Sequence, residues 1–136
     1  MTLKVHPVDV QYIARVWPKI EGFLAKGLEH TDDFNLEQIK VYLSTGTWLL
    51  LVATDDNNEI HGAMTVSFSS GPNDRTAVLT ALGGKHVVNL EVFGQVCSIL
   101  RTLGATRIQA YARDSAVRLY ERVGMNKKAT LTEIRI

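Results

Sequence analysis

Apolar residues in the first third of the chain recur at the spacing of an α-helix. The first set is Ile13, Val16, Trp17, Ile20, Phe23, Leu24 and Leu28. Asp9 precedes this set, where its carboxylate would cap the helix, and Pro18 interrupts it, so we expect a kink or a restart there. A second short helix is expected over Leu36–Leu43, ending near Gly46, and Thr2–Val8 is a candidate first strand.

The middle of the chain changes to the pattern of β-strands. Thr47–Thr54 is an apolar run rich in strand-forming residues, and the polar turn 55–58 separates it from an alternating run, Ile60–Ser69. These two runs predict an antiparallel hairpin. A third strand is expected over Thr76–Leu82, ended by the pair Gly83-Gly84.

The last third returns to helical spacing and then alternates again. One helix is expected over Val88–Leu103, with Gly104 as its left-handed cap. Its apolar face comprises Leu90, Phe93, Val96, Cys97, Leu100 and Leu103. A strand over Arg107–Ala112 follows, then a short helix that begins at Asp114 and ends before Gly124. The segment 126–136 alternates well enough to supply one or two closing strands.

The predicted order is therefore β-α-α-β-β-β-α-β-α-β(β), a mixed α/β fold in one domain over residues 1–136. The length suits a single domain, and 46% hydrophobic residues suffice for a core without disulfides. The one cysteine, Cys97, allows no internal disulfide, and we expect it to pack in the core. No apolar run exceeds six residues and no signal peptide is evident, so we expect a cytoplasmic protein without membrane contact.

The charge is divided unevenly although the net charge is only +1. Residues 1–68 hold 5 basic and 9 acidic side chains, whereas residues 69–136 hold 10 and 5. A basic half indicates an anionic ligand such as a phosphate or a nucleotide, and a solvated basic surface is the alternative. Nucleic acid is the weaker choice, because no recognised motif and no interleaved aromatics accompany the basic residues.

The short C-terminal helix carries a specific resemblance. Residues 113–125 read RDSAVRLYERVGM, which resembles the N-x-x-A-x-x-L-Y-x-x-x-G-F pattern of the GNAT superfamily of N-acetyltransferases. Ala116, Leu119, Tyr120 and Gly124 match, whereas Arg113 stands where the family has Asn and Met125 where it has Phe. The element order extends the resemblance over the chain, which is similar to short GNAT-like proteins of phages and prophages.

The resemblance implies acetyl-CoA as co-substrate. Its pantetheine arm would lie between the strands Thr76–Leu82 and Arg107–Ala112, and its pyrophosphate at the start of the next helix. The corresponding loop departs from the family's R/Q-x-x-G-x-G/A pattern, because Val87 and Asn89 replace the two glycines. Either Gly83-Gly84 shifts the tight turn and Lys85 and His86 add charge, or the anion site is lost. The cofactor-binding residues predicted on the first reading are Leu82, Gly83, Gly84, Lys85, His86, Val87, Arg113 and Arg118.

The resemblance also assigns Tyr120 as the general acid that protonates the leaving thiolate. The alternative is that Tyr120 is an aromatic core residue without a catalytic role. No carboxylate lies on the strand Thr76–Leu82 to act as base, and of the histidines we expect His61 at the surface and His86 beside the phosphates. Arg113 and Arg118 would reach the 3′-phosphate of the coenzyme, with Arg122 more exposed. No histidine pair has the spacing of a metal site.

Two hypotheses follow for function. The first is an N-acetyltransferase that transfers acetyl directly to an amine of a small molecule or protein, held between the N-terminal helices and the segment Ser69–Arg75. The second is a GNAT-fold protein without catalysis that serves as a structural or interaction module, in a phage context and hence in a host cytoplasm. A homodimer is compatible with both.

Overall fold

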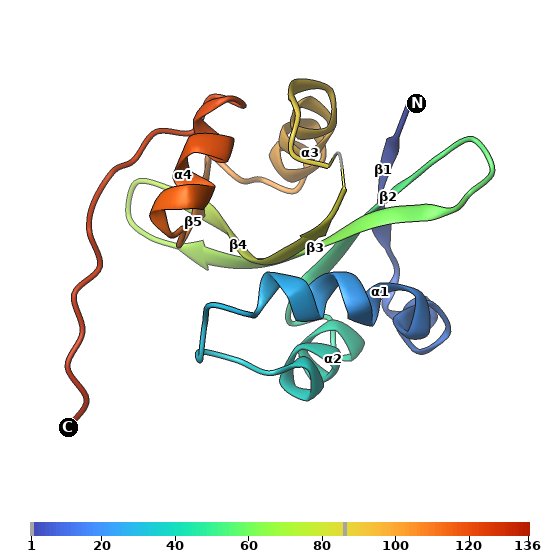
Figure 1. The fold of residues 1–136 in the computed structure, drawn as a ribbon, viewed down its shortest axis with the longest axis horizontal. Coiled ribbons are helices and arrows are strands. Elements are labelled where there is room, and N and C mark those ends of the chain that lie inside the picture. Colours follow the sequence, from blue (N-terminus) through green and yellow to red (C-terminus); the bar gives the residue numbers. More distant parts are fainter. Residues whose placement is uncertain (1, 86) are drawn as a thin grey trace.

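The computed structural model describes residues 2–85 and 87–136, and it shows a five-stranded sheet covered by helices on both faces (Figure 1). Helices α1 and α2 lie on one face, and α3 and α4 lie on the other. The strands are β1 (Lys4–Val8), β2 (Leu49–Thr54), β3 (Ile60–Ser70), β4 (Arg75–Gly84) and β5 (Arg107–Ala110). The helices are the 3-10 turn η1 (Val10–Tyr12), α1 (Ile13–Gly27), α2 (Leu36–Ser44), α3 (Leu90–Thr102) and α4 (Asp114–Glu121).

Polar side chains cap η1 and α2, whereas the N-cap of α1 is Tyr12 without a side-chain cap, so Asp9 caps the 3-10 turn before the predicted helix. The side chain of Asp9 accepts a hydrogen bond from the backbone N–H of Gln11 at the start of η1. Asn35 and Gln38 form a reciprocal capping box that starts α2. The restart expected at Pro18 does not occur, because α1 continues through it from Ile13 to Gly27. Proline can remain in a helix where tertiary packing holds it, and here Trp17 and Ile20 on either side are buried.

The strands follow one another across the sheet in the order β1-β2-β3-β4-β5. β1 to β4 are antiparallel neighbours, so the predicted hairpin of β2 and β3 is confirmed, with Leu50 opposite Thr65. β5 pairs parallel to β4. The helix α3 makes this crossover, as the strand–helix–strand order requires.

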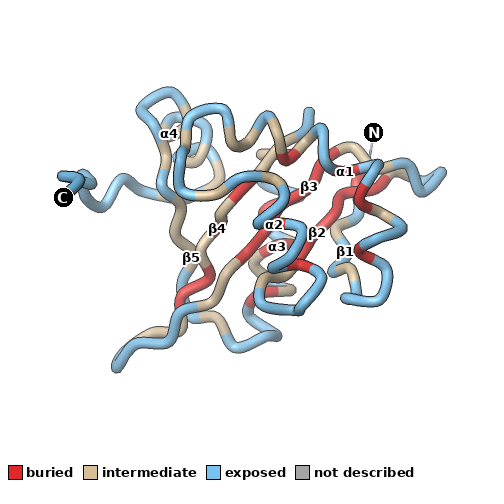
Figure 2. Tube along the Cα trace, turned by 90° about the horizontal axis from the view of Figure 1, so that it is seen from below, coloured by how far each residue is buried: buried red, intermediate tan, exposed pale blue. Residues whose placement is uncertain are grey.

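Two apolar clusters fill the space on either side of the sheet. Leu51 and Val66 face the cluster under α3, which includes Phe93, whereas Leu50 and Val52 face the cluster under α1 and α2. Because both faces are covered, successive residues of β2 and β3 are buried, and the alternation expected for β3 is replaced by a continuous buried run (Figure 2). The mixed α/β fold predicted from the element order is therefore the observed one.

A single glutamine ties α3 to the first strand. The side-chain oxygen of Gln95 accepts from the N–H of Val5 at 2.8 Å, and its nitrogen donates to the carbonyl of Leu3 at 2.9 Å. The predicted apolar face of α3 differs from expectation at three positions. Leu90 is 71% exposed at the first helical position, Leu103 is 45% exposed just after the helix, and Cys97 is half-buried rather than in the core.

The main disagreement with the predicted order lies after α4. Residues 126–136 are exposed and form no strand in the described structure, so the expected closing strands are absent. β5 is also shorter than expected and spans only Arg107–Ala110. Alternation describes a side-chain pattern, whereas a strand also needs a neighbouring edge that accepts its hydrogen bonds. The glycine caps are as expected, with φ of +91° at Gly104 and +95° at Gly124. Within the described residues no helix is long and apolar enough to cross a membrane.

Candidate functional site

The parallel strands β4 and β5 separate partway along their length. They pair only where Thr76–Leu79 face Arg107–Ala110, and β4 then continues for a further five residues to Gly84. No other described strand pairs with that edge of β4. Its peptide groups need hydrogen-bonding partners, so an extended ligand with amide groups can bind there as a strand would.

A β-bulge at Thr80 marks the point of separation. Thr65 of β3 pairs with Ala81 and Val66 pairs with Leu79, so Thr80 is the extra residue on β4. Its hydroxyl donates to the carbonyl oxygen of Thr65 at 3.1 Å, and the two threonine hydroxyl oxygens lie 2.7 Å apart. A bulge bends and twists its strand, which accounts for the departure of β4 from β5. The bulge could not be predicted from the sequence, because two threonines in strands do not show which residues of the neighbouring strands oppose each other.

The pair Gly83-Gly84 has a structural reason that differs from the predicted tight turn. Both residues lie within β4, where they pair with Ala63 and Gly62 of β3. A Cβ on Gly83 would collide with the backbone carbonyl of Phe23 in α1, and one on Gly84 would collide with the backbone of β3. Glycine is therefore needed for the close approach of α1 and β3 to β4. The strand ends at this pair as expected, but both glycines belong to it, so β4 extends beyond the predicted last residue Leu82 to Gly84.

The loop before α3 is organised around Asn89, a residue that stands where the family has glycine. Asn89 is the N-cap of α3, and its side-chain oxygen accepts from the N–H of Val92 at 2.9 Å. Val87 is 4% exposed and packs in the apolar cluster under α3, whereas Lys85 is exposed. The predicted cofactor residue His86 lies outside the described residues. One N–H group at this helix start is therefore already bonded by the chain itself.

Tyr120 lies on α4 and packs against α3. Its ring meets the ring of Phe93 edge to face, with centroids 6.1 Å apart. Burial raises the pKa of the Tyr120 phenol above its ordinary value, because the phenolate would lose its hydration. The hydroxyl therefore stays protonated at neutral pH and has a proton to donate.

Arg113 and Arg118 are exposed on and before α4. Arg113 occupies the N-cap position but its side chain caps nothing. Neither arginine makes a side-chain ion pair or hydrogen bond with any described residue. Both guanidinium groups are thus available to an anion from solution. Arg118 shares α4 with Tyr120 and Arg113 is the N-cap residue of that helix, so the predicted acid and two predicted phosphate ligands lie on one helix and its cap.

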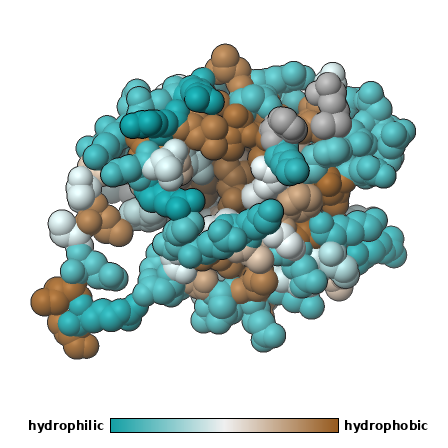
Figure 3. Space-filling view, viewed as in Figure 1, coloured by the Kyte–Doolittle hydropathy of each residue, from teal (hydrophilic) through white to brown (hydrophobic). Residues whose placement is uncertain are grey.

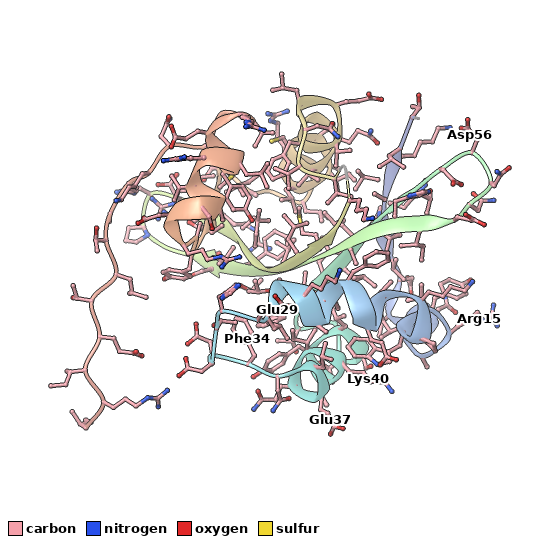
Figure 4. All side chains as sticks on the ribbon, in the orientation of Figure 1. Arg15, Glu29, Phe34, Glu37, Lys40 and Asp56 are labelled. Carbon is pink, nitrogen blue, oxygen red and sulfur yellow. The ribbon has the colours of Figure 1, made fainter. Side chains whose placement is uncertain are left out.

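His61 belongs to a separate group on the β2–β3 hairpin. Its Nε2 lies 2.7 Å from Oδ2 of Asp55, and Glu59 completes a cluster whose ligand atoms lie within 4.8 Å of one another. The hydrogen bond from His61 lowers the pKa of the Asp55 carboxyl, and backbone N–H groups of Glu59 and Asn57 add to the effect. Figure 4 shows Asp56 of this hairpin at the opposite end of the sheet from α4. His61 therefore does not serve as base beside Tyr120.

Apolar side chains are visible between α3 and α4, over β4, in the space-filling view (Figure 3). An apolar pocket lies between the sheet and α3, lined by Leu82, Val87, Val92, Val96 and residues of β1 to β3. The lining of this pocket includes none of Tyr120, Arg113 and Arg118.

On the other side of the sheet, Figure 4 places Glu29 and Phe34 in the connection between α1 and α2. This connection joins the two N-terminal helices, which form one wall of the acceptor site predicted from the sequence.

No protein family known from sequence matches this chain, and no curated protein sequence matches it. Solved structures do match in shape. One is an aminoglycoside acetyltransferase from an uncultured soil metagenomic sample, crystallised with trehalose, with a TM-score of 0.71 at 13% identity over 98% of this chain and 95% of that one. A ribosomal-protein-alanine N-acetyltransferase from Brucella melitensis biovar Abortus 2308 has a TM-score of 0.71 at 14% identity over 99% of both chains. Another metagenomic aminoglycoside acetyltransferase has a TM-score of 0.68 at 17% identity over 100% of this chain and 99% of that one.

These similarities establish the fold. The chain has the fold of the GNAT acetyltransferases, with the five-stranded mixed sheet and four helices described above. At such low identity, neither the activity nor the acceptor of those proteins carries over with the fold.

Proposed function

We propose that this protein is an acetyl-CoA-dependent N-acetyltransferase. The observation that carries the proposal is the separation of β4 from β5 at the Thr80 bulge, which leaves one edge of β4 without a strand partner. Pantetheine is an extended chain with two amide groups, so it fits the role of the missing strand. Its thioester would then lie near the bulge, on the side of the sheet that carries α4 and Tyr120.

In this reaction the amine nitrogen attacks the thioester carbonyl, the C–N bond forms and the C–S bond breaks. Tyr120 would give its phenolic proton to the departing sulfur and regain one from water. The amine would lose its proton to water, since no carboxylate lies on β4 to receive it. Orientation of the two reactants by the divided sheet would make the main contribution to the rate.

The phosphates of the coenzyme would meet exposed positive charge. Lys85 at the end of β4 and Arg113 and Arg118 on α4 are exposed and carry no described ion pair. Leu82, Gly83 and Gly84 would contribute backbone groups along the free edge of β4. The acceptor would be an amine of a small molecule or a protein, and it would enter from the connection between α1 and α2.

A second candidate is a GNAT-fold protein without catalysis, which serves as a structural or interaction module. The specific observation in its favour is the Asn89 cap, which bonds the N–H of Val92 where the pyrophosphate would need such groups. The buried side chain of Val87 adds to this, because it holds the loop toward the core. The phage context suggested by the sequence stays a prediction.

Calorimetric titration with acetyl-CoA separates the two candidates. The first predicts micromolar binding that Arg113→Ala and Arg118→Ala each weaken about tenfold, as expected for the loss of a charge-assisted bond worth ~1.5 kcal/mol. Arg101→Ala is the matched control, because Arg101 is exposed in the last turn of α3, remote from that helix's start. No heat at millimolar acetyl-CoA would remove the enzyme proposal and leave the structural one.

Asn89→Gly tests the capping observation directly. Glycine at the N-cap costs only a few tenths of a kcal/mol, so the fold should survive while the N–H of Val92 becomes free for a phosphate. We expect acetyl-CoA to bind several-fold more tightly to this variant. Unchanged or weaker binding would show that the phosphates do not approach the start of α3.

A further inference from the structure

Three side chains that can bind a metal ion lie together beside the turn of the β2–β3 hairpin. Asp55 directly follows β2, Glu59 directly precedes β3, and His61 is the second residue of β3. One imidazole nitrogen and one oxygen of each carboxylate all lie within 4.8 Å of one another. These three residues are called the hairpin triad here, and no step of the proposed transfer reaction uses them.

A β-bulge sets the direction of the His61 side chain. Ile60 and Gly62 pair with consecutive residues of β2, so His61 between them is the extra residue on β3. A bulge turns a side chain to a new direction, and bulges are common beside functional sites. The backbone of His61 is held in place, because its carbonyl oxygen lies where a Cβ on Gly84 of β4 would be. The imidazole therefore extends toward the turn from a packed strand.

The carboxylate of Asp55 is oriented by the turn itself. Its Oδ1 accepts the backbone N–H groups of Asn57 and Glu59 at 2.8 and 3.0 Å. Its Oδ2 faces Nε2 of His61 at 2.7 Å. The side chains of His61 and Asp55 are only 27% and 14% exposed, so these two donor atoms are positioned and sheltered.

Glu59 is the mobile member of the hairpin triad. Its side chain is exposed, and among the described residues it forms no ion pair. Zn–N and Zn–O bonds of about 2.0–2.2 Å at tetrahedral angles set ligand atoms about 3.4 Å apart. The contact between Nε2 and Oδ2 needs to widen by only ~0.7 Å to reach that spacing, and a rotation of the exposed Glu59 side chain supplies the third ligand.

The donor set favours one class of cation. An imidazole nitrogen suits Zn²⁺ and its neighbours in the first transition row, whereas Mg²⁺ and Ca²⁺ prefer oxygen ligands alone. Two carboxylates balance the charge of a divalent cation, and the neutral imidazole with its proton on Nδ1 offers the lone pair of Nε2. Asp56, labelled in Figure 4, is exposed in the same turn and adds negative charge that attracts cations.

We propose that the hairpin triad binds Zn²⁺ through Nε2 of His61 and one carboxylate oxygen each of Asp55 and Glu59, with water as the fourth ligand. The cation joins the end of β2 to the start of β3 and so holds the hairpin closed across its turn. This inference does not depend on the proposed activity, because the hairpin lies at the opposite end of the sheet from α4.

Calorimetric titration of the untagged full chain with Zn²⁺ tests the site. We expect one ion per chain, and we expect His61→Ala and Glu59→Gln each to weaken binding at least about tenfold, since even the loss of a group that only orients a metal ligand has that effect. His30→Ala is the matched control, because His30 is an exposed histidine in the α1–α2 connection, and it should leave Zn²⁺ binding unchanged. Mg²⁺ should give no heat at the same concentrations.

Thermal denaturation supplies a second measurement. Excess Zn²⁺ should raise the midpoint of the wild type by mass action and leave that of Glu59→Gln almost unchanged. Glu59 is exposed and lies outside the strands, so this variant keeps the test valid even if His61→Ala fails to fold. No binding at millimolar Zn²⁺, or equal affinity in the wild type and either variant, would overturn the proposal and leave the contact between Asp55 and His61 as a hydrogen bond that only closes the turn.

Discussion

Tyr120 is the residue on which the proposed chemistry depends. Tyr120→Phe keeps the ring against Phe93 and removes only the proton donor. We expect kcat to fall by about 10²-fold, within the range for general acid catalysis, while the Kd for acetyl-CoA stays within about twofold. Steady-state kinetics and titration calorimetry measure the two quantities. Tyr12→Phe is the matched control, because Tyr12 lies in η1, and equal loss in both variants would remove Tyr120 from the mechanism.

The raised pKa of Tyr120 also predicts the form of two pH profiles. Burial raises this pKa, so the descending limb of kcat should lie above the ordinary tyrosine value of 10.0. The same burial contributes stability that is present below pH 10 and is lost as the pH rises through the folded-state pKa, because only the unfolded chain then ionises. Between pH 9 and 11, an order-of-magnitude window around that value, the denaturation midpoint of the wild type should fall relative to that of Tyr120→Phe, and a constant difference would contradict this titration.

The contact between α1 and β4 decides the stability of the element that bears the site. Gly83→Ala should lower the free energy of unfolding by ~2–3 kcal/mol, because the new methyl meets the backbone carbonyl of Phe23 and neither backbone can withdraw. Gly22→Ala on the exposed face of α1 meets nothing within 4 Å and should raise stability by ~0.5–1 kcal/mol. Urea denaturation of the two variants measures the difference. Similar stabilities would contradict the close packing of α1 on β4.

The role of that glycine could not be predicted from the sequence, although the strand could. Gly83-Gly84 after an apolar run is read locally as the end of a strand, and only the packing of Phe23, sixty residues earlier, shows that the strand continues. The Thr65–Thr80 pair is similar, because the bulge depends on which residues of β3 and β4 oppose each other. By contrast, the glycines at 104 and 124 act within their own helix ends and were predicted correctly.

For the molecule as a whole, the basic second half should make cofactor binding sensitive to salt. With Arg113, Arg118 and Lys85 exposed, raising the ionic strength should weaken acetyl-CoA binding severalfold, because the Debye length falls from ~10 Å at 0.1 M to ~3 Å at 1 M. S-acetylpantetheine, which lacks the nucleotide phosphates, should show almost no such dependence. Equal salt dependence of the two ligands in calorimetry would show that the basic residues do not meet the phosphates.

The sequence by itself determined the order of elements as far as α4, the fold class and the position of Tyr120 on the last helix. These depend on hydrophobic spacing, caps and a motif, all of which act over a few residues. Only the tertiary structure decided that the Thr80 bulge separates β4 from β5, that Asn89 caps α3, and that residues 126–136 form no strand. Each of these features depends on which groups meet in the folded chain. A hydrogen bond or a steric clash requires a particular partner, and the sequence around one residue does not identify that partner.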